Sequence, residues 1–246
     1  MIATSAARAN RGSETAGRTS EELREIVQHV GAELELAPAE HIIEWAFATF
    51  GERFCITSSM GDAVVAHLAA KVAPGIDVVF LDTGYHFAET IGTRDAVAAT
   101  MNVNVITIEP KQTVAEQDAE HGPELFKRDP DLCCALRKVE PLRTSLDGYD
   151  AWATGLRRAE TKNRVIAPVV GWDAKKKKVK VSPIARWSDE DVDTYVAENG
   201  VLVNPLVYDN YPSIGCWPCT RRVAPGDDPR SGRWAGTNKT ECGIHM

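Results

Sequence analysis

The sequence has no long hydrophobic run and no excess of positive charge. No apolar stretch approaches the roughly 18 residues that span a bilayer, and residues 1–20 are polar, without the apolar core of a secretory signal. The net charge is −7, whereas nucleic-acid-binding proteins usually carry a basic face. These absences predict a cytoplasmic protein with neither a membrane nor a nucleic acid as partner.

The chain of 246 residues is long enough for one domain with a sizeable core. We expect a disordered leader over residues 1–20, a single α/β domain over 21–220 and a mobile, catalytic C-terminal tail over 221–246. The tail is rich in Pro, Gly and Arg and shows no periodicity. Long irregular segments of this kind are usually functional or disordered.

Short apolar runs alternate with helical patterns along the middle of the chain. Strands are expected at 54–57, 76–81, 103–108, 152–154 and 179–184, with helices between and around them. This alternation predicts a mostly parallel sheet flanked by helices. Within the helical pattern at 131–146, Pro141 should introduce a kink or a break. The lysine run at 175–178 precedes a short alternating segment and is expected to form the tip of a solvent-exposed hairpin.

Three of the expected strands end in small polar residues. The segments that follow them read Ser-Ser-Met-Gly-Asp at 58–62, Asp-Thr-Gly at 82–84 and Thr-Gly-Leu-Arg-Arg at 154–158. Ligands bind at the carboxyl ends of strands in open sheets of this class, and a helix that starts at such an end can hold an anion. Arg157 and Arg158 add guanidinium groups suited to phosphate or sulfate oxygens. The pattern predicts a compact anionic ligand.

The six cysteines divide into a group of four and two single residues. Cys133, Cys134, Cys216 and Cys219 supply four thiolates, which suit either zinc or an iron–sulfur cluster. Adjacent cysteines on a helix diverge by about 100°, and a cluster accommodates that divergence more readily than one ion does. Cys55 lies between two apolar residues and is expected to pack in the core.

Cys242 lies near the end of the irregular tail. Cationic residues close to it in sequence, among them Arg230, Arg233 and Lys239, could lower its pKa and favour the thiolate. Cys242 is therefore a candidate nucleophile.

These segments together resemble the phosphoadenylyl-sulfate/adenylyl-sulfate reductase family, in particular its cluster-containing bacterial branch. The resemblance covers roughly residues 54–245 and is carried by the three strand ends, the Glu-Cys-Gly-Ile-His motif at 241–245, and the Cys-Cys and Cys-x-x-Cys pairs. It implies a fold related to the ATP pyrophosphatases, with a flexible C-terminal tail. The ATP pyrophosphatase loop usually reads Ser-Gly-Gly-x-Asp-Ser; this chain lacks its glycines and last serine, which puts ATP cleavage in doubt.

The resemblance also implies the roles of individual residues. The four paired cysteines would hold a [4Fe–4S] cluster, and Cys242, His245 and Lys138 would be catalytic. Substrate binding would involve residues from the strand ends and from the later arginines: Ser58, Ser59, Gly61, Asp62, Thr83, Gly155, Arg157, Arg158, Arg164, Arg230 and Arg233.

The activity implied by the resemblance is reduction of adenylyl sulfate to sulfite and AMP in assimilatory sulfate reduction. The Cys242 thiolate would take the sulfonate group, and thioredoxin would then release sulfite. Three alternatives stay open: a reductase of the 3′-phosphorylated nucleotide or of both nucleotides, an ATP-dependent RNA-thiolating enzyme with a cluster, and a non-enzymatic zinc or iron–sulfur module.

Overall fold

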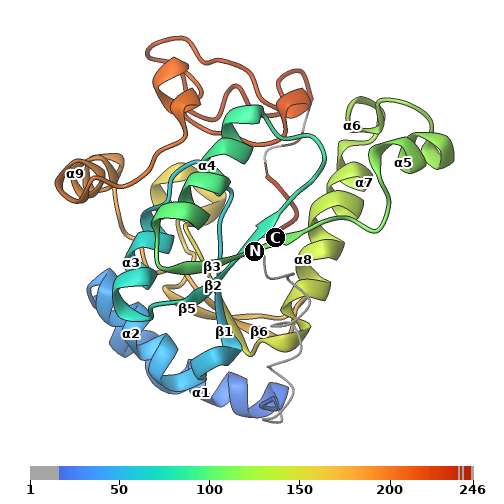
Figure 1. Cartoon of the computed structure of the whole chain (residues 1–246). Helices are drawn as coiled ribbons and strands as arrows, with labels where there is room; N and C mark the ends of the chain where they lie inside the picture. The colour runs from blue at the N-terminus through green and yellow to red at the C-terminus, as the bar shows by residue number, and fades with distance from the viewer. Residues whose placement is uncertain (1–16, 238, 240, 245–246) are drawn as a thin grey trace.

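The computed structural model describes residues 17–237, 239 and 241–244. Its sheet has six strands in the order β3-β2-β1-β4-β6-β5, and every neighbouring pair is parallel except β5 and β6 (Figure 1). The strands are β1 Phe54–Thr57, β2 Ile76–Leu81, β3 Val103–Ile108, β4 Ala151–Thr154, β5 Val170–Asp173 and β6 Lys178–Val181. The expected mostly parallel α/β sheet is confirmed. The expected leader lies largely in residues 1–16, outside the described residues.

The helices cover both faces of the sheet. The described α-helices are α1 Ser20–Leu34, α2 Ala39–Phe50, α3 Val64–Val72, α4 Ala88–Thr100, α5 Val114–His121, α6 Leu125–Arg128, α7 Pro130–Cys134, α8 Glu140–Ser145 and α9 Asp189–Asn199. Short 3₁₀ turns lie at Gly51–Arg53, Leu146–Gly148, Arg158–Glu160, Lys162–Arg164, Pro205–Asp209 and Trp217–Cys219. None of these described helices has both the length and the apolar character needed to cross a membrane.

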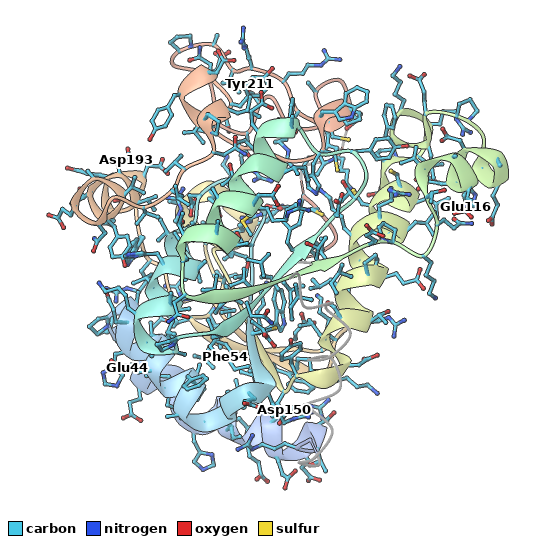
Figure 2. All side chains as sticks on the ribbon, in the orientation of Figure 1. Glu44, Phe54, Glu116, Asp150, Asp193 and Tyr211 are labelled. Atoms are coloured by element: carbon cyan, nitrogen blue, oxygen red, sulfur yellow. The ribbon has the colours of Figure 1, made fainter. Side chains whose placement is uncertain are left out.

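Alternate residues of β1 point to two separate cores. Phe54, labelled in Figure 2, and Ile56 belong to the larger core, which α1, α2, α3 and α4 cover. Cys55 is fully buried on the other face, beside Trp152 of β4 and Leu142 of α8. The prediction that Cys55 packs in the core is confirmed. Helices on both faces are what a parallel sheet requires.

A π-helical turn over Ala135–Val139 joins α7 to α8. Pro141 follows immediately, in the first turn of α8. Proline has no N–H for the preceding turn and its ring clashes with the carbonyl four residues earlier, so the wider turn lets the chain continue. The expected break near Pro141 is therefore found as a change of helix type. Such π turns often occur at functional sites.

The predicted hairpin at the lysine run is formed by β5 and β6, but one of its lysines is not in water. Asp173 accepts hydrogen bonds from the backbone N–H groups of Lys175 and Lys176, and this closes the turn. The side chain of Lys176 then folds inward, is only 5% exposed, and pairs with Asp173 at 2.9 Å. The expectation of a fully solvated lysine run is wrong at this position.

The chain after α9 crosses the carboxyl-end side of the sheet. In Figure 1 this orange-to-red segment runs along the upper part of the molecule before it returns toward the middle. An isolated bridge pairs Thr220 with Arg233, and Trp234 is 4% exposed. Within the described part of the tail, Gly232, Trp234, Glu241 and Cys242 are buried, whereas most of residues 221–231 are exposed.

Candidate active site

The carboxyl ends of β1, β2 and β4 line a cavity of about 270 Å³. This volume is near the lower end of the roughly 300–1,000 Å³ typical of small-molecule sites. Ser58, Ser59, Gly61 and Asp62 form one wall, and Gly155 follows β4 on another. The prediction that these strand ends meet is confirmed by the parallel pairing of β1 with both of its neighbours.

The loop at 58–62 is held from two sides. Ser58 Oγ accepts a hydrogen bond from the backbone N–H of Met60 at 3.1 Å, and Met60 adopts a left-handed φ of 58°. A non-glycine residue at such a φ costs about 1–2 kcal/mol. From the other side, the buried amide of Asn204 donates to the Met60 carbonyl at 3.1 Å. These contacts stabilise the loop with Met60 in its left-handed conformation.

Asp62 and Arg157 lie together at the edge of the cavity. Burial raises the pKa of Asp62, while the backbone N–H of Val64 and the charge of Arg157 oppose that shift. The Arg157 guanidinium also pairs with Asp189 at 2.7 Å. The pairing holds Arg157 at the cavity wall.

The cavity contains positive charge that the described side chains do not fully satisfy. Arg157 Nη1, Arg230 Nε and Arg233 Nε are buried, and none of the three has a hydrogen-bond partner in the part of the chain that the structure describes. Burial and the neighbouring Arg230 lower the pKa of Arg233, although arginine stays protonated in proteins. Buried donors normally have partners. The three arginines therefore indicate a ligand that supplies anionic oxygen atoms.

Lys138 lies in the π turn and contributes to the walls of two cavities, the one described above and a smaller one beside it. Burial alone would lower the pKa of Lys138, but its interactions with the neighbouring Cys216, Cys242 and Cys134 raise it overall. The ammonium group is thus held as a cation between the two cavities. It can stabilise negative charge in either one.

The smaller cavity is lined by Cys133, Cys134, Cys216 and Cys219. Burial and the neighbouring Cys216 and Cys219 raise the pKa of Cys133 to about 11, so a metal or cluster would have to displace its proton. Among the described residues, no three His, Cys, Asp or Glu side chains converge closely enough to hold a single ion. Four cysteine side chains are a donor set that both zinc sites and iron–sulfur clusters use.

Cys242 forms part of the wall of the larger cavity and is 9% exposed. A hydrogen bond from the Cys134 thiol and the charges of Lys138 and Arg233 lower the pKa of Cys242 well below its usual range, although burial opposes them. A buried thiolate beside cations is an activated nucleophile. The structure thus brings Cys242, Lys138, Arg164, Arg230 and Arg233 to one cavity.

Three residues expected at the substrate lie elsewhere or outside the described part of the chain. Thr83 is fully buried and its hydroxyl lies 3.2 Å from Cys216 Sγ. Arg158 pairs with Glu35 at 2.6 Å, and its Nε donates to the Ala167 carbonyl. Neither is among the residues that line the larger cavity. His245 lies outside the described residues.

Other residues at the site carried no separate signal in the sequence. His86 lines the cavity after β2, and Asn204 supports the loop from a segment with no periodicity. Glu241 belongs to a motif that was noted for its cysteine, yet it is 6% exposed and pairs with Arg164 at 2.8 Å. A buried carboxylate is a strong indicator once burial is known, but burial in an irregular segment leaves no pattern in the sequence.

Known proteins share this architecture and these motifs. A family profile described as "Phosphoadenosine phosphosulfate reductase domain" matches residues 53–222. The adenosine 5'-phosphosulfate reductase of Streptomyces coelicolor is 68% identical over 228 residues, which cover 93% of this chain and 97% of that protein. The protein of the same name from Mycolicibacterium smegmatis is 57% identical over 228 residues, with the same coverage of 93% and 97%.

Solved structures agree with the fold. The phosphoadenylyl-sulfate reductase of Candida auris, crystallised as a phosphate complex, has 27% identity and a TM-score of 0.68, covering 79% of this chain and 96% of that one. The FMN adenylyltransferase of Candida glabrata, at 10% identity and a TM-score of 0.53, shares the fold alone and covers 84% of this chain and 76% of that one. The ATP-pyrophosphatase-like fold expected from the resemblance is confirmed. On the profile match and these identities, the chain belongs to the phosphoadenosine phosphosulfate reductase family.

Proposed function

We propose that the protein reduces adenylyl sulfate to sulfite and AMP in assimilatory sulfate reduction, with thioredoxin as the electron donor. The observation that carries this proposal is the position of Cys242 in the wall of a cavity where three arginines have unpartnered buried nitrogens. The curated relatives, at 68% and 57% identity, are named as reductases of this nucleotide. The cations can bind the anionic groups of an activated sulfate while the neighbouring thiol attacks its sulfur atom.

The nucleotide would bind across the strand ends. The loop at 58–62 and Gly155 are the parts of the wall that would accept the adenosine, and the cations in the same wall suit the phosphosulfate. Lys138 and Arg233 lie in this wall and lower the pKa of Cys242, and Arg230 lines the same cavity. This arrangement would bring the sulfonate group toward the thiolate.

In the first step the Cys242 thiolate attacks the sulfur atom of adenylyl sulfate. An Sγ–S bond forms, the bond between sulfur and the bridging oxygen breaks, and AMP leaves with that oxygen. Lys138 and the arginines stabilise the charge that develops on the leaving phosphate, where fixed donors contribute most to rate. The product is S-sulfocysteine at position 242.

In the second step a thioredoxin thiolate attacks Cys242 Sγ and sulfite leaves with the electron pair of the Sγ–S bond. The resulting mixed disulfide is opened by the second thioredoxin thiol, which restores the Cys242 thiolate. The two electrons come from the thioredoxin dithiol. We propose that the tail at 221–246 is mobile, because a thiol that is 9% exposed must open to meet a second protein.

Cys133, Cys134, Cys216 and Cys219 would hold a [4Fe–4S] cluster. Bound there, it would supply structural order and electrostatic stabilisation, since the electrons for the reaction come from thiols. With Cys134 engaged as a ligand, Lys138 and Arg233 remain as the groups that favour the Cys242 thiolate. Lys138, in the wall of both cavities, can neutralise charge on each side.

Sulfite release from adenylyl sulfate and from its 3′-phosphorylated form, each with thioredoxin, tests the proposal. We expect turnover with adenylyl sulfate and at least ten-fold less with the other nucleotide. Iron and acid-labile sulfide per chain should be measured on the same sample. Equal or better turnover of the 3′-phosphorylated nucleotide would reject the substrate assignment, and zinc without iron would reject the cluster.

A further inference from the structure

The segment that carries Cys242 is attached to the domain on the N-terminal side of the cysteine by Glu241. Both carboxylate oxygens of Glu241 are used: Oε1 accepts from Arg164 Nε at 2.9 Å and Oε2 from Arg164 Nη2 at 2.8 Å. Thr161 Oγ1 donates to the same carboxylate at 3.0 Å. Paired hydrogen bonds between a guanidinium and a carboxylate fix orientation as well as distance.

Arg164 is itself held in place. Its Nη1 donates to Glu160 Oε2 at 2.5 Å, and that oxygen also accepts the backbone N–H of Arg157 at 2.8 Å. Only 9% of the Arg164 side chain is exposed. The guanidinium therefore provides a rigid attachment point for Glu241 at the cavity wall.

On the C-terminal side of the cysteine, the backbone carbonyl of Ile244 accepts a hydrogen bond from Lys176 Nζ at 2.9 Å. Lys176 comes from the turn between β5 and β6, 68 residues earlier in the chain. Its ammonium group also pairs with Asp173 at 2.9 Å and lies 5.1 Å from the centre of the Trp152 ring. These contacts hold Lys176 on a rigid part of the sheet.

We propose that Lys176 and the Glu241–Arg164 pair are positioning groups that hold the closed tail at two points on either side of Cys242. Two attachments, one to a side chain before the cysteine and one to a carbonyl after it, fix both the place and the direction of the short segment between them. Between the attachments, Gly243 leaves room for Val139, whose Cγ2 would lie 3.0 Å from an added Cβ. The two attachments thus hold Cys242 Sγ close to Lys138 and Arg233.

This inference rests on the proposed function, because it assigns the two attachments to the step in which Cys242 attacks. The closed tail is needed when the thiolate meets the nucleotide. The open tail is needed when thioredoxin attacks. Loosening either attachment should therefore slow sulfonate transfer and leave the thioredoxin step unchanged or faster.

The first test does not depend on turnover. The rate of alkylation of Cys242 by iodoacetamide, followed by mass spectrometry of the tail peptide, reports how often the segment opens. In cluster-loaded protein we expect Lys176→Met to raise this rate about ten-fold, since the variant loses the charge-assisted hydrogen bond to the Ile244 carbonyl. Lys175 is the exposed neighbour of Lys176 and provides the matched control. Lys175→Met should leave the alkylation rate unchanged.

Glu241→Gln is the second variant, and it leaves the hairpin and the core untouched. It keeps the shape of the side chain but removes its charge, and we expect alkylation about ten-fold faster, with the effects of the two variants multiplying in the double variant. Lys176→Arg keeps a cation and should restore part of the protection. Alkylation rates in Lys176→Met and Glu241→Gln that equal those of Lys175→Met would overturn the proposal.

Single-turnover measurements then separate the two steps. We expect formation of S-sulfocysteine to slow about ten-fold in both variants, while thioredoxin reduces the preformed S-sulfocysteine at an undiminished rate. Equal slowing of the two steps would indicate general damage and reject a positioning role. Faster alkylation in a protein that makes no sulfite from adenylyl sulfate would uphold the two attachments and reject the proposed function instead.

Discussion

The hydroxyl of fully buried Thr83 lies within hydrogen-bond distance of Cys216 Sγ, at 3.2 Å. Thr83 follows β2, on the strand end that also begins the cavity wall, so one turn connects the sheet to the cysteine group. The same hydroxyl accepts the backbone N–H of Tyr85 at 3.2 Å, which fixes its orientation. Cys216 is one of the four residues proposed to hold the cluster. Residues that orient a metal ligand usually affect metal affinity nearly as much as the ligand does.

Replacing Thr83 should weaken retention of the proposed cluster. Thr83→Val keeps the shape but removes the hydroxyl, and we expect iron release to a ferrous chelator to become about ten-fold faster. Thr83→Ser keeps the hydroxyl and serves as the control, with release close to that of the unmodified protein. Identical release from the valine and serine variants would contradict this role.

Asn204 should support both stability and nucleotide affinity. Its amide donates to Met60 O and to Thr90 Oγ1, each at 3.1 Å. Asn204→Ala leaves the Met60 carbonyl buried without this donor, so we expect the free energy of unfolding to fall by about 2 kcal/mol and KM to rise. Urea unfolding and steady-state kinetics measure the two effects. Asn199→Ala, at the end of α9, should leave KM unchanged.

Gly215 should be needed for nucleotide binding, because the Arg233 side chain passes close to its Cα. A Cβ at this position would lie 2.4 Å from Arg233 Nη2. The guanidinium is the flexible end of its side chain, so Gly215→Ala should displace Arg233 from the cavity without unfolding the protein. We expect KM for the nucleotide to rise about ten-fold. Gly92→Ala, where an added Cβ meets nothing within 4 Å, should not change KM; equal KM values for the two variants would count against the displacement.

Docking of the tail should depend on pH through Glu241. Burial raises the pKa of Glu241, but hydrogen bonds and charge from Arg164, with the charge of Arg230, lower it overall from 4.5. A carboxylate with a lowered folded pKa stabilises the docked tail above its unfolded pKa, and this contribution is lost as the pH falls through the folded value.

Hydrogen exchange of the tail amides, compared with Glu241→Gln at each pH, measures this contribution. We expect the extra protection to be complete above about pH 4.5 and to disappear below the lowered pKa. The comparison at equal pH cancels the intrinsic pH dependence of exchange. Protection that does not differ between the two proteins at neutral pH would show that the ion pair does not hold the tail.

The sheet was largely predictable from the sequence because its central strands are buried on both sides. β1 and β2 match the expected ranges since each is a mainly apolar run that ends in a polar turn. β3 is an edge strand whose residues are only partly buried, and its alternating sequence Val-Asn-Val-Ile-Thr-Ile identified it. β5 was not predicted, because Val170–Asp173 contains a glycine and a polar end with no alternation. Strands defined mainly by pairing with a neighbour give weak local signals.

Site residues that belong to a sequence motif could be predicted from the sequence. Site residues that are identified only by their burial in the folded chain could not. The residues predicted after β1 and β4, together with Cys242, lie at one cavity as expected, whereas Thr83 after β2 does not line it. Arg158 follows Arg157 in sequence, yet it pairs with Glu35 of the α1–α2 connection, since Arg157 is extended whereas Arg158 begins a 3₁₀ turn and their side chains point in different directions. Lys176 looks like its neighbours in the lysine run, and only the turn formed by Asp173 directs it inward.

The most direct test of the account is the covalent state of Cys242 after a single turnover without thioredoxin. The protein is mixed with adenylyl sulfate, digested and analysed by mass spectrometry, and AMP release is measured in parallel. The account predicts a sulfonate group on Cys242, AMP released in equal amount, and an equal amount of sulfite once thioredoxin is added. Sulfite formation by Cys242→Ser, or a sulfonate group on another cysteine, would contradict it.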